Sequence, residues 1–174
     1  MEQNAENNID GNTCKAWVLP IANDMNVAVG EFEMIHIISE WLRFYTVPHS
    51  PTYCNKILIW QGQLVPVFDI NLYIKSQYSI NNNESAVPDF VCIVAYRAEG
   101  QTKTIQFGAV SLSALPYKVD VTDELFCGYP DEEQRWASIA LSCFQHAEYG
   151  PTPIVDLQRI YCPEPFHLDM VRVS

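Results

Sequence analysis

The chain has 174 residues, of which 48% are hydrophobic and 18% charged, a composition typical of a globular protein and incompatible with disorder over the whole length. Ten Lys and Arg residues stand against 21 Asp and Glu residues, which gives a formal net charge of -11. Binding to nucleic acids and to anionic membranes depends on basic surfaces, so neither partner is expected. The length suits one domain, or two small lobes that share a core.

Neither a secretory signal nor a membrane-spanning segment is expected. The first eight residues have no basic start and no apolar run, and every apolar stretch is far shorter than the ~20 residues of a membrane helix. The cysteines contain no C-x-x-C pair, which favours thiols in a reducing cytoplasm, although their even number also permits disulfides. There are six of them: Cys14, Cys54, Cys92, Cys127, Cys143 and Cys162.

The polar, Asn-rich residues 1–13 are predicted to be a disordered tail. We expect one folded region over residues 14–161, divided by a polar connection around 75–88, and a C-terminal extension over 162–174. The folded region begins with a hairpin whose strands cover 15–21 and 25–30.

Residues 31–39 carry Phe32, Ile35 and Ile38 at steps of three, which predicts a short helix, although Ile35 and Ile37 also permit a strand. A second hairpin joins 57–60 to 64–68 through a turn that contains Gly62. Further strands are predicted over 90–96, 104–110, 119–125, 138–144 and 152–156.

One short pattern occurs twice, 87 positions apart, as V-P-V-F-D-I over 65–70 and T-P-I-V-D-L over 152–157. In each copy a strand that contains a proline, Pro66 or Pro153, leads to an aspartate, Asp69 or Asp156, placed to cap a short helical turn. The recurrence indicates two similar lobes, with a chance match as the alternative. We therefore predict a mainly β fold of two small barrels with short helices.

The sequence contains few candidates for catalytic or metal-binding residues. The four histidines are dispersed without metal-ligand spacing, and no phosphate-binding loop or nucleophile elbow is present. Cys143 and His146 could form a thiol beside its base, but Cys143 is more simply a core residue and His146 a turn residue. Asp69 and Asp156 are interpreted as caps and not as a carboxylate pair. Neither catalysis nor a metal or cofactor is expected.

The tryptophans are more informative about binding. Trp60 begins the tip of the second hairpin, where it is either a core residue or an anchor for a protein partner. Trp41 and Trp136 fall in predicted connections and pose the same two alternatives. The acidic run over 131–133 is expected to be a solvated turn.

The arrangement resembles the CheW-like coupling domain of bacterial chemotaxis systems. Residues 59–70, I-W-Q-G-Q-L-V-P-V-F-D-I, are similar to the family pattern N-L-R-G-x-x-x-P-V-x-D-L and carry most of the resemblance. Weaker similarity covers 27–29, 34–38, 107–111 and 154–157, so that the match extends over about residues 14–161.

The resemblance implies two SH3-like five-stranded β-barrels with short helices and no catalytic activity. Such proteins act in the cytoplasm, where they join the regulatory domain of a CheA-type histidine kinase to the cytoplasmic tip of a chemoreceptor. Barrel-to-barrel contacts hold the assembly, and the groove between the lobes receives the receptor. On this basis we expect partner contacts at Met34, His36, Trp60, Gln61 and Gly62. The structural positions of the motifs are Pro66, Asp69, Pro153 and Asp156.

Three positions depart from the family pattern: Gln61 replaces an arginine, His36 a glutamate and Lys56 a glycine. All three lie in segments that the family uses for contacts, which would suit an accessory coupler, for example in a type IV pilus system. A protein-binding module outside chemotaxis, a small Cys/His hydrolase and a small-ligand binder are the alternatives.

Overall fold

The structure is a computed structural model that describes residues 13–77, 87–98, 104–131 and 133–162. The predicted tail (apart from Thr13), the predicted extension (apart from Cys162) and the centre of the polar connection lie outside these ranges.

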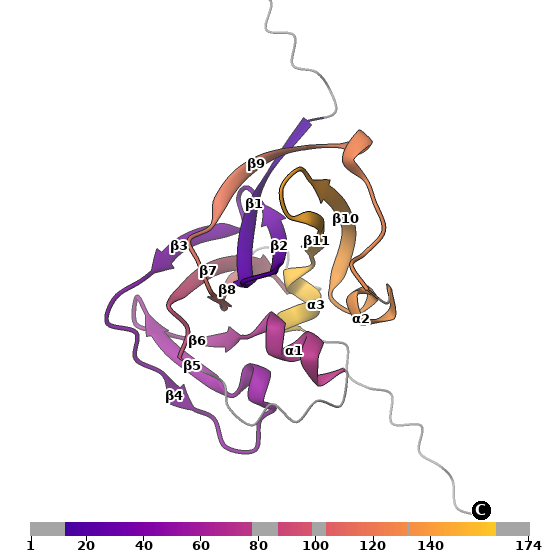
Figure 1. Cartoon of the computed structure of the whole chain (residues 1–174). Helices are drawn as coiled ribbons and strands as arrows, with labels where there is room; N and C mark the ends of the chain where they lie inside the picture. Colours follow the sequence, from indigo (N-terminus) through magenta and orange to yellow (C-terminus); the bar gives the residue numbers. More distant parts are fainter. Residues whose placement is uncertain (1–12, 78–86, 99–103, 132, 163–174) are drawn as a thin grey trace, which may run out of the picture.

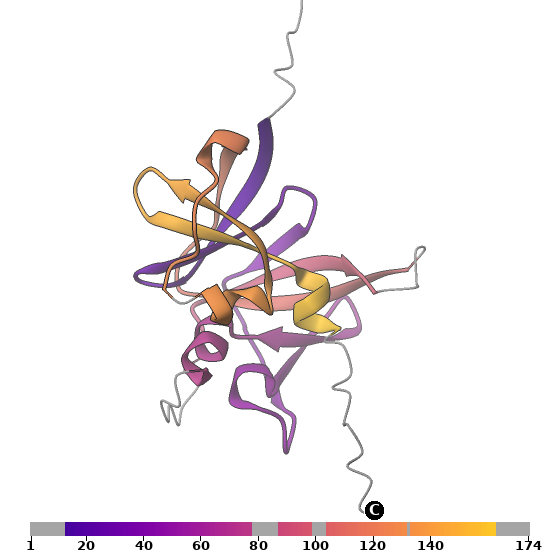
Figure 2. The same cartoon turned by 90° about the vertical axis from the view of Figure 1, so that its right-hand side faces the viewer.

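Two curled sheets make up the described chain, and Figure 2 shows one above the other. The first sheet has the strand order β10-β11-β2-β1-β9. Its strands are β1 (Thr13–Ala22), β2 (Met25–Gly30), β9 (Tyr117–Thr122), β10 (Ala140–His146) and β11 (Gly150–Val155).

The second sheet has the strand order β3-β7-β8-β6-β5-β4. Its strands are β3 (Met34–Ile38), β4 (Tyr45–Thr46), β5 (Lys56–Trp60), β6 (Gln63–Phe68), β7 (Phe90–Arg97) and β8 (Ile105–Leu112). The helical elements of Figure 1 are η1 (Thr52–Cys54), α1 (Ile70–Ser76), η2 (Asp123–Leu125), α2 (Glu133–Ala137) and α3 (Leu157–Tyr161).

Central strands such as β1 and β7 are covered on both faces, which explains their nearly continuous apolar runs. In β1, Leu19 joins a core cluster between the sheets, whereas Val18 joins a smaller cluster on the other face of the first sheet. In β7, Val94 joins the same inter-sheet cluster, whereas Ile93 packs inside the curl of the second sheet. Alternate side chains of one strand therefore belong to different cores.

The helix predicted over residues 31–39 is wrong, and the strand alternative is confirmed. The Glu33 N–H donates to the Gly30 carbonyl at 3.0 Å, and the Gly30 N–H donates to the Glu33 carboxylate at 2.6 Å. This turn redirects the chain into β3, which pairs antiparallel with β7. Isoleucines at 35, 37 and 38 suit the pleated sheet better than a helix, because they are branched at Cβ.

The two predicted hairpins are present as β1–β2 and β5–β6. The repeated pattern also recurs in space: β6 pairs in parallel with β8 at Val67 and Phe68, and β11 pairs in parallel with β2 at Ile154. Each motif proline, Pro66 or Pro153, stands directly before the first residue of that parallel pairing. A residue without an N–H is tolerated there, because the parallel ladder begins only after it.

Candidate partner-binding surface

The tip of the β5–β6 hairpin is a two-residue turn. Trp60 pairs with Gln63, and between them Gln61 and Gly62 have φ angles of 48° and 78°. Two successive positive φ angles define a type I′ turn, whose twist matches that of the flanking strands. Glycine adopts this conformation without strain, while the exposed Gln61 does so at some cost. The turn holds the Gln61 amide at the outermost point of the hairpin.

Trp60 and His36 come together across the curl of the second sheet. Their rings stack with centroids 6.5 Å apart and planes inclined by 30°. Trp60 also meets Phe107 edge-on, with ring centroids 5.0 Å apart, and both of these rings pack against the core cluster inside the curl. The strands β3 and β5 are not neighbours in the second sheet. The contact between His36 and Trp60 therefore shows that the sheet curls until these two strands approach each other. Trp60 is half-buried, so it contributes to the core and also keeps an accessible part.

Met34 does not join this cluster. Its side chain is half-buried against the core cluster between the sheets. The pairing of β3 with β7 shifts between Met34 and His36, so Met34 packs against the core between the sheets while the exposed His36 contacts Trp60. Lys56, the third departure from the family pattern, holds its ammonium 5.5 Å from the centroid of the Phe44 ring. Burial lowers the pKa of Lys56.

An exposed apolar face extends from the hairpin, and sequence reasoning missed it. Ile59 pairs with Leu64, which is 68% exposed, and the row Tyr45–Ile57–Pro66 lies beside them on the same face. Contiguous exposed apolar side chains mark interaction sites more often than isolated ones do. The alternation of side chains along a strand could have revealed this face: if Leu58 and Trp60 point inward, Ile57 and Ile59 must point outward. We call these five residues (Tyr45, Ile57, Ile59, Leu64 and Pro66) the hairpin face.

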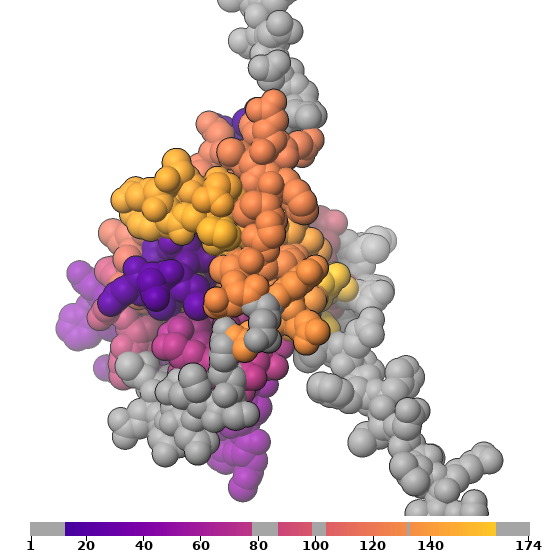
Figure 3. All heavy atoms as spheres, turned by 45° about the vertical axis from the view of Figure 1, so that its right-hand side comes forward, coloured from indigo at the N-terminus to yellow at the C-terminus, as the bar shows by residue number. Residues whose placement is uncertain are grey.

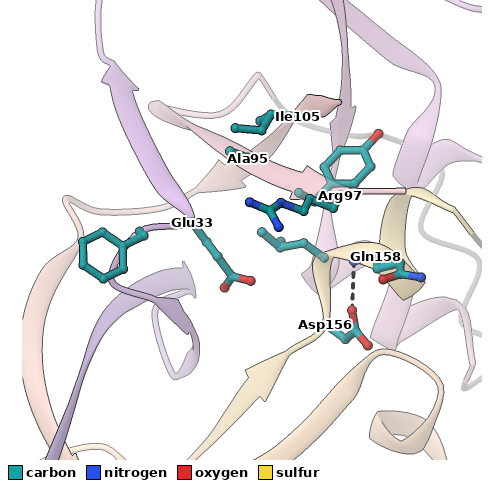
Figure 4. Close-up of a pocket in the computed structure, with 9 residues that line it drawn as sticks. Glu33, Ala95, Arg97, Ile105, Asp156 and Gln158 are labelled. Atoms are coloured by element: carbon teal, nitrogen blue, oxygen red, sulfur yellow. Dashed lines mark hydrogen bonds between the residues drawn. The ribbon is translucent and has the colours of Figure 1, made fainter. Parts of the chain in front are cut away.

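A second surface feature is a hollow of about 450 Å³, shown in Figure 4. Its walls are the β2–β3 connection, the adjoining ends of β7 and β8, and the start of α3, so strands of the second sheet and the segments that follow β2 and β11 of the first sheet contribute. Figure 4 shows the Glu33 carboxylate directed into the hollow below Arg97. Burial raises the pKa of Glu33, and the nearby Asp156 carboxylate raises it further, while the hydrogen bond from Gly30 opposes both effects. The lining residues are Phe32, Glu33, Ala95, Tyr96, Arg97, Ile105, Asp156, Leu157 and Gln158.

The two motif aspartates cap helices. The Asp69 carboxylate accepts a hydrogen bond from the Leu72 N–H at 2.8 Å. The Asp156 carboxylate accepts from the Gln158 and Arg159 N–H groups at 2.9 and 3.3 Å and forms an ion pair with the Arg159 guanidinium at 3.2 Å. Both side chains therefore satisfy backbone donors of the first helical turn.

Cys143 and His146 do not form a thiol–imidazole pair. Cys143 is 1% exposed, its sulfur lies 3.7 Å from that of Cys127, and burial together with this contact raises its pKa to about 12. His146 Nδ1 accepts hydrogen bonds from the backbone N–H groups of Glu148 and Tyr149. A buried thiol with such a high pKa is a poor nucleophile, and this geometry gives no support to the hydrolase alternative.

The other two tryptophans differ from each other. Trp41 is 89% exposed, in a connection as predicted. Trp136 is 1% exposed, lies on α2 and donates its indole N–H to the Pro130 carbonyl at 2.9 Å. Its placement in a connection is therefore wrong, and of the two alternatives left open for it the structure supports the core residue and not the anchor. The acidic turn predicted up to residue 133 ends earlier, because α2 begins at Glu133; residue 132 lies outside the described ranges.

Over the residues that the structure describes, no three His, Cys, Asp or Glu side chains are grouped so that they could hold a metal ion. In the same ranges, no helix is long and apolar enough to cross a membrane.

Comparison with known proteins identifies the type of fold. No protein-family profile matches the chain, and no curated protein matches it in sequence. Among solved structures, the scaffolding protein TtCheW from Thermoanaerobacter tengcongensis superposes with a TM-score of 0.61 at 14% sequence identity. The match covers 91% of this chain and 97% of that one. The chain therefore has a CheW-like fold, mainly β, with short helices.

Proposed function

We propose that this chain is a non-enzymatic adaptor that couples a chemoreceptor to a CheA-type histidine kinase in the cytoplasm. The observation that carries the proposal is the likeness in fold to a scaffolding protein over nearly the full length of both chains. A second support is the motif around the β5–β6 hairpin, where the sequence resemblance coincides with exposed apolar strand residues.

An adaptor needs separate surfaces for its partners, and two are available here. The hairpin face, with the Gln61-Gly62 tip beside it, offers an apolar sheet surface for a barrel of the kinase regulatory domain. The hollow between the sheets, with Phe32 (89% exposed) in its lining, offers a recess for a segment of the receptor tip. We assign Trp60 and His36 to the edge of the kinase surface, and Met34 to a supporting role in the core between the sheets.

The departures from the family pattern favour an accessory system. Gln61 presents a neutral amide where an arginine would present a charged fork of donors, so a partner carboxylate would be held less strongly. His36 stacks on Trp60 and replaces the glutamate of the family pattern, so the negative charge of that glutamate is missing from this position. We therefore place the adaptor in an alternative chemosensory pathway, such as one that controls type IV pili.

Calorimetric titration tests this proposal. The full chain is titrated with the regulatory domain of each CheA-type kinase of its own organism and with the cytoplasmic hairpin of each receptor. We expect a Kd in the micromolar range or tighter for one kinase and one receptor. Leu64→Ala should weaken kinase binding at least tenfold, about 1.4 kcal/mol. The matched control is Leu141→Ala, which removes a similarly exposed leucine (60%) from the first sheet and should leave kinase binding unchanged.

The outcomes separate the alternatives. Binding to a kinase without any receptor would indicate a scaffold within a kinase array and would refute the coupling role. Failure to bind every kinase and every receptor would refute the proposed function and favour a CheW-like module with partners outside chemotaxis.

A further inference from the structure

Cys127 and Cys143 face each other directly across two antiparallel segments. Phe126 and Phe144 form an isolated antiparallel bridge, and the Cys127 N–H donates to the Cys143 carbonyl at 3.0 Å. Their sulfur atoms lie 3.7 Å apart. Cys143 belongs to β10, whereas Cys127 belongs to the connection between η2 and α2, so no sheet ladder beyond this bridge joins the two segments.

This placement fits the geometry of a disulfide. Residues directly opposite each other in a hydrogen-bonded antiparallel pair have Cα atoms about 5.5 Å apart, within the range of roughly 4.4–6.8 Å found for bridged cysteines. Rotation of the two side chains alone can then bring the sulfurs to bonding distance. We propose that Cys127 and Cys143 form a reversible intramolecular disulfide when the chain meets a low-molecular-weight disulfide such as oxidised glutathione.

The two thiols differ in a way that sets the order of the reaction. Cys127 is half-buried and can be reached from solvent, whereas Cys143 is buried. The Cys127 thiolate attacks one sulfur of oxidised glutathione, the glutathione disulfide bond breaks, and one glutathione thiolate leaves. Cys143 then loses its proton to solvent, attacks the Cys127 sulfur of the mixed disulfide and expels the second glutathione. In total, two protein thiols are oxidised and one glutathione disulfide is reduced to two thiols.

Burial makes the second step the slow one. The pKa of Cys143 is raised to about 12 by its burial and by the adjacent Cys127 thiol, so little thiolate is present at neutral pH. The first adduct should therefore accumulate before the internal disulfide closes. In a reducing environment such a pair stays reduced until oxidants rise, which is the usual behaviour of a redox-responsive site.

The disulfide would fasten the connection between η2 and α2 to β10. In Figure 3 the orange segment that holds η2 and α2 lies at the surface of the face shown. Helix α2 of this segment places Trp136 in the core between the sheets. Closing this loop covalently restricts the unfolded chain, so oxidation should raise the melting temperature. This inference does not rest on the proposed function.

The test uses the full-length chain in glutathione buffers of stepwise increasing oxidised-to-reduced ratio. Free thiols are then blocked, and peptides are mapped by mass spectrometry. We expect one linkage, Cys127 to Cys143, to appear and to disappear again on reduction, with a higher melting temperature in the oxidised form. The map on the unmodified sequence needs no variant, so a folding defect cannot obscure it.

Two variants test the order of attack. Cys143→Ser should stop at a glutathione adduct on Cys127, and Cys127→Ser should give neither the adduct at 127 nor the linkage. The control Cys54→Ser, which changes a half-buried cysteine elsewhere, should leave the linkage intact. The proposal is overturned if folded chain shows no Cys127–Cys143 linkage at any ratio, or if intermolecular disulfides through the exposed Cys14 form while both thiols stay free.

Discussion

Asp69 and Asp156, 87 positions apart, occupy equivalent places in the two sheets. Their backbone angles nearly coincide, with φ/ψ of -102°/98° and -96°/105°, and both carboxylates accept hydrogen bonds from the first turn of a helix. Both helices bury aliphatic side chains in the core between the sheets: Ile70 and Ile74 from α1, and Leu157 and Ile160 from α3. The repeated unit thus contributes one short helix from each lobe to the core that they share.

Loss of either cap should destabilise the fold to a similar extent. Asp69→Ala and Asp156→Ala each leave backbone N–H groups of a first helical turn without an acceptor, and we expect each to lower the free energy of unfolding by about 1 kcal/mol. Urea unfolding at neutral pH measures both. The controls Asp69→Asn and Asp156→Asn keep the acceptor oxygen and should recover most of the loss. Asn variants as unstable as the Ala variants would show that the negative charge matters and not the cap.

Much of this fold could be predicted from local patterns. The β1–β2 and β5–β6 hairpins follow from apolar strands around turn residues, and the two proline–aspartate motifs have equivalent backbone settings. These features depend on neighbours within a few residues, which the sequence displays directly.

The features that were predicted wrongly or not predicted at all have a different origin. Apolar residues at steps of three suggested a helix at 31–39, but the deciding interaction is the ladder with β7, about sixty residues further along the chain. Similarly, the contacts of His36 with Trp60 and of Cys127 with Cys143 join segments through the curl of a sheet or a single bridge. Trp136 was placed in a connection because its helix has only five residues. Long-range pairing therefore decides the first three of these features, whereas Trp136 lies in a helix too short for local patterns to predict.

Gly108 lies under the ring of Tyr161. A Cβ atom at position 108 would lie 2.3 Å from the Tyr161 Cζ atom, far inside contact distance. The ring cannot easily move, because it stacks on Tyr96 with centroids 4.9 Å apart and its hydroxyl donates to the Ala109 carbonyl at 2.7 Å. Gly108→Ala should therefore lower the free energy of unfolding by about 1–3 kcal/mol, as measured by chemical denaturation.

A matched control is present in the chain. Gly128 has no atom within 4 Å of its hypothetical Cβ, so Gly128→Ala should be nearly neutral. In a Tyr161→Leu background, the cost of Gly108→Ala should shrink, because the smaller side chain leaves room for the methyl group. An equal cost in both backgrounds would place the strain in the backbone of β8 and not in the ring contact.

Trp60 should influence both folding and binding. Trp60→Ala removes the contacts with Phe107 and His36, so we expect lower stability, and it should also weaken binding of the kinase regulatory domain by about 2 kcal/mol. Calorimetry at a temperature where circular dichroism shows the variant folded separates the two effects. Trp41→Ala is the control for stability: its indole is almost fully exposed, and the change should stay within about 0.5 kcal/mol. Unchanged affinity in a folded Trp60→Ala protein would remove Trp60 from the proposed contact surface.

The carboxylate of Glu33 should make stability fall as the pH rises from acid to neutral. Burial raises its pKa in the folded chain above the ordinary value of 4.5, so the folded state holds the proton more tightly than the unfolded state. The stabilisation is present in full below about pH 4.5 and is lost as the pH rises through the folded-state pKa. Glu33→Gln keeps an oxygen that can accept from the Gly30 N–H but cannot ionise. The Glu33→Gln variant should therefore gain unfolding free energy relative to the unmodified chain, and this gain should be larger at pH 7 than at pH 4.

Glu31 provides a control of opposite sign two positions away. Its carboxylate accepts from the Lys118 ammonium at 2.8 Å, and this contact lowers its pKa. The ion pair contributes stability above the unfolded-state pKa and loses it as the pH falls, so Glu31→Gln should cost stability at pH 7 and nothing in acid. The effect should be small and should fade in high salt, because the pair is open to solvent. Parallel pH profiles for the two variants would contradict the assignment of Glu33 as the buried carboxylate.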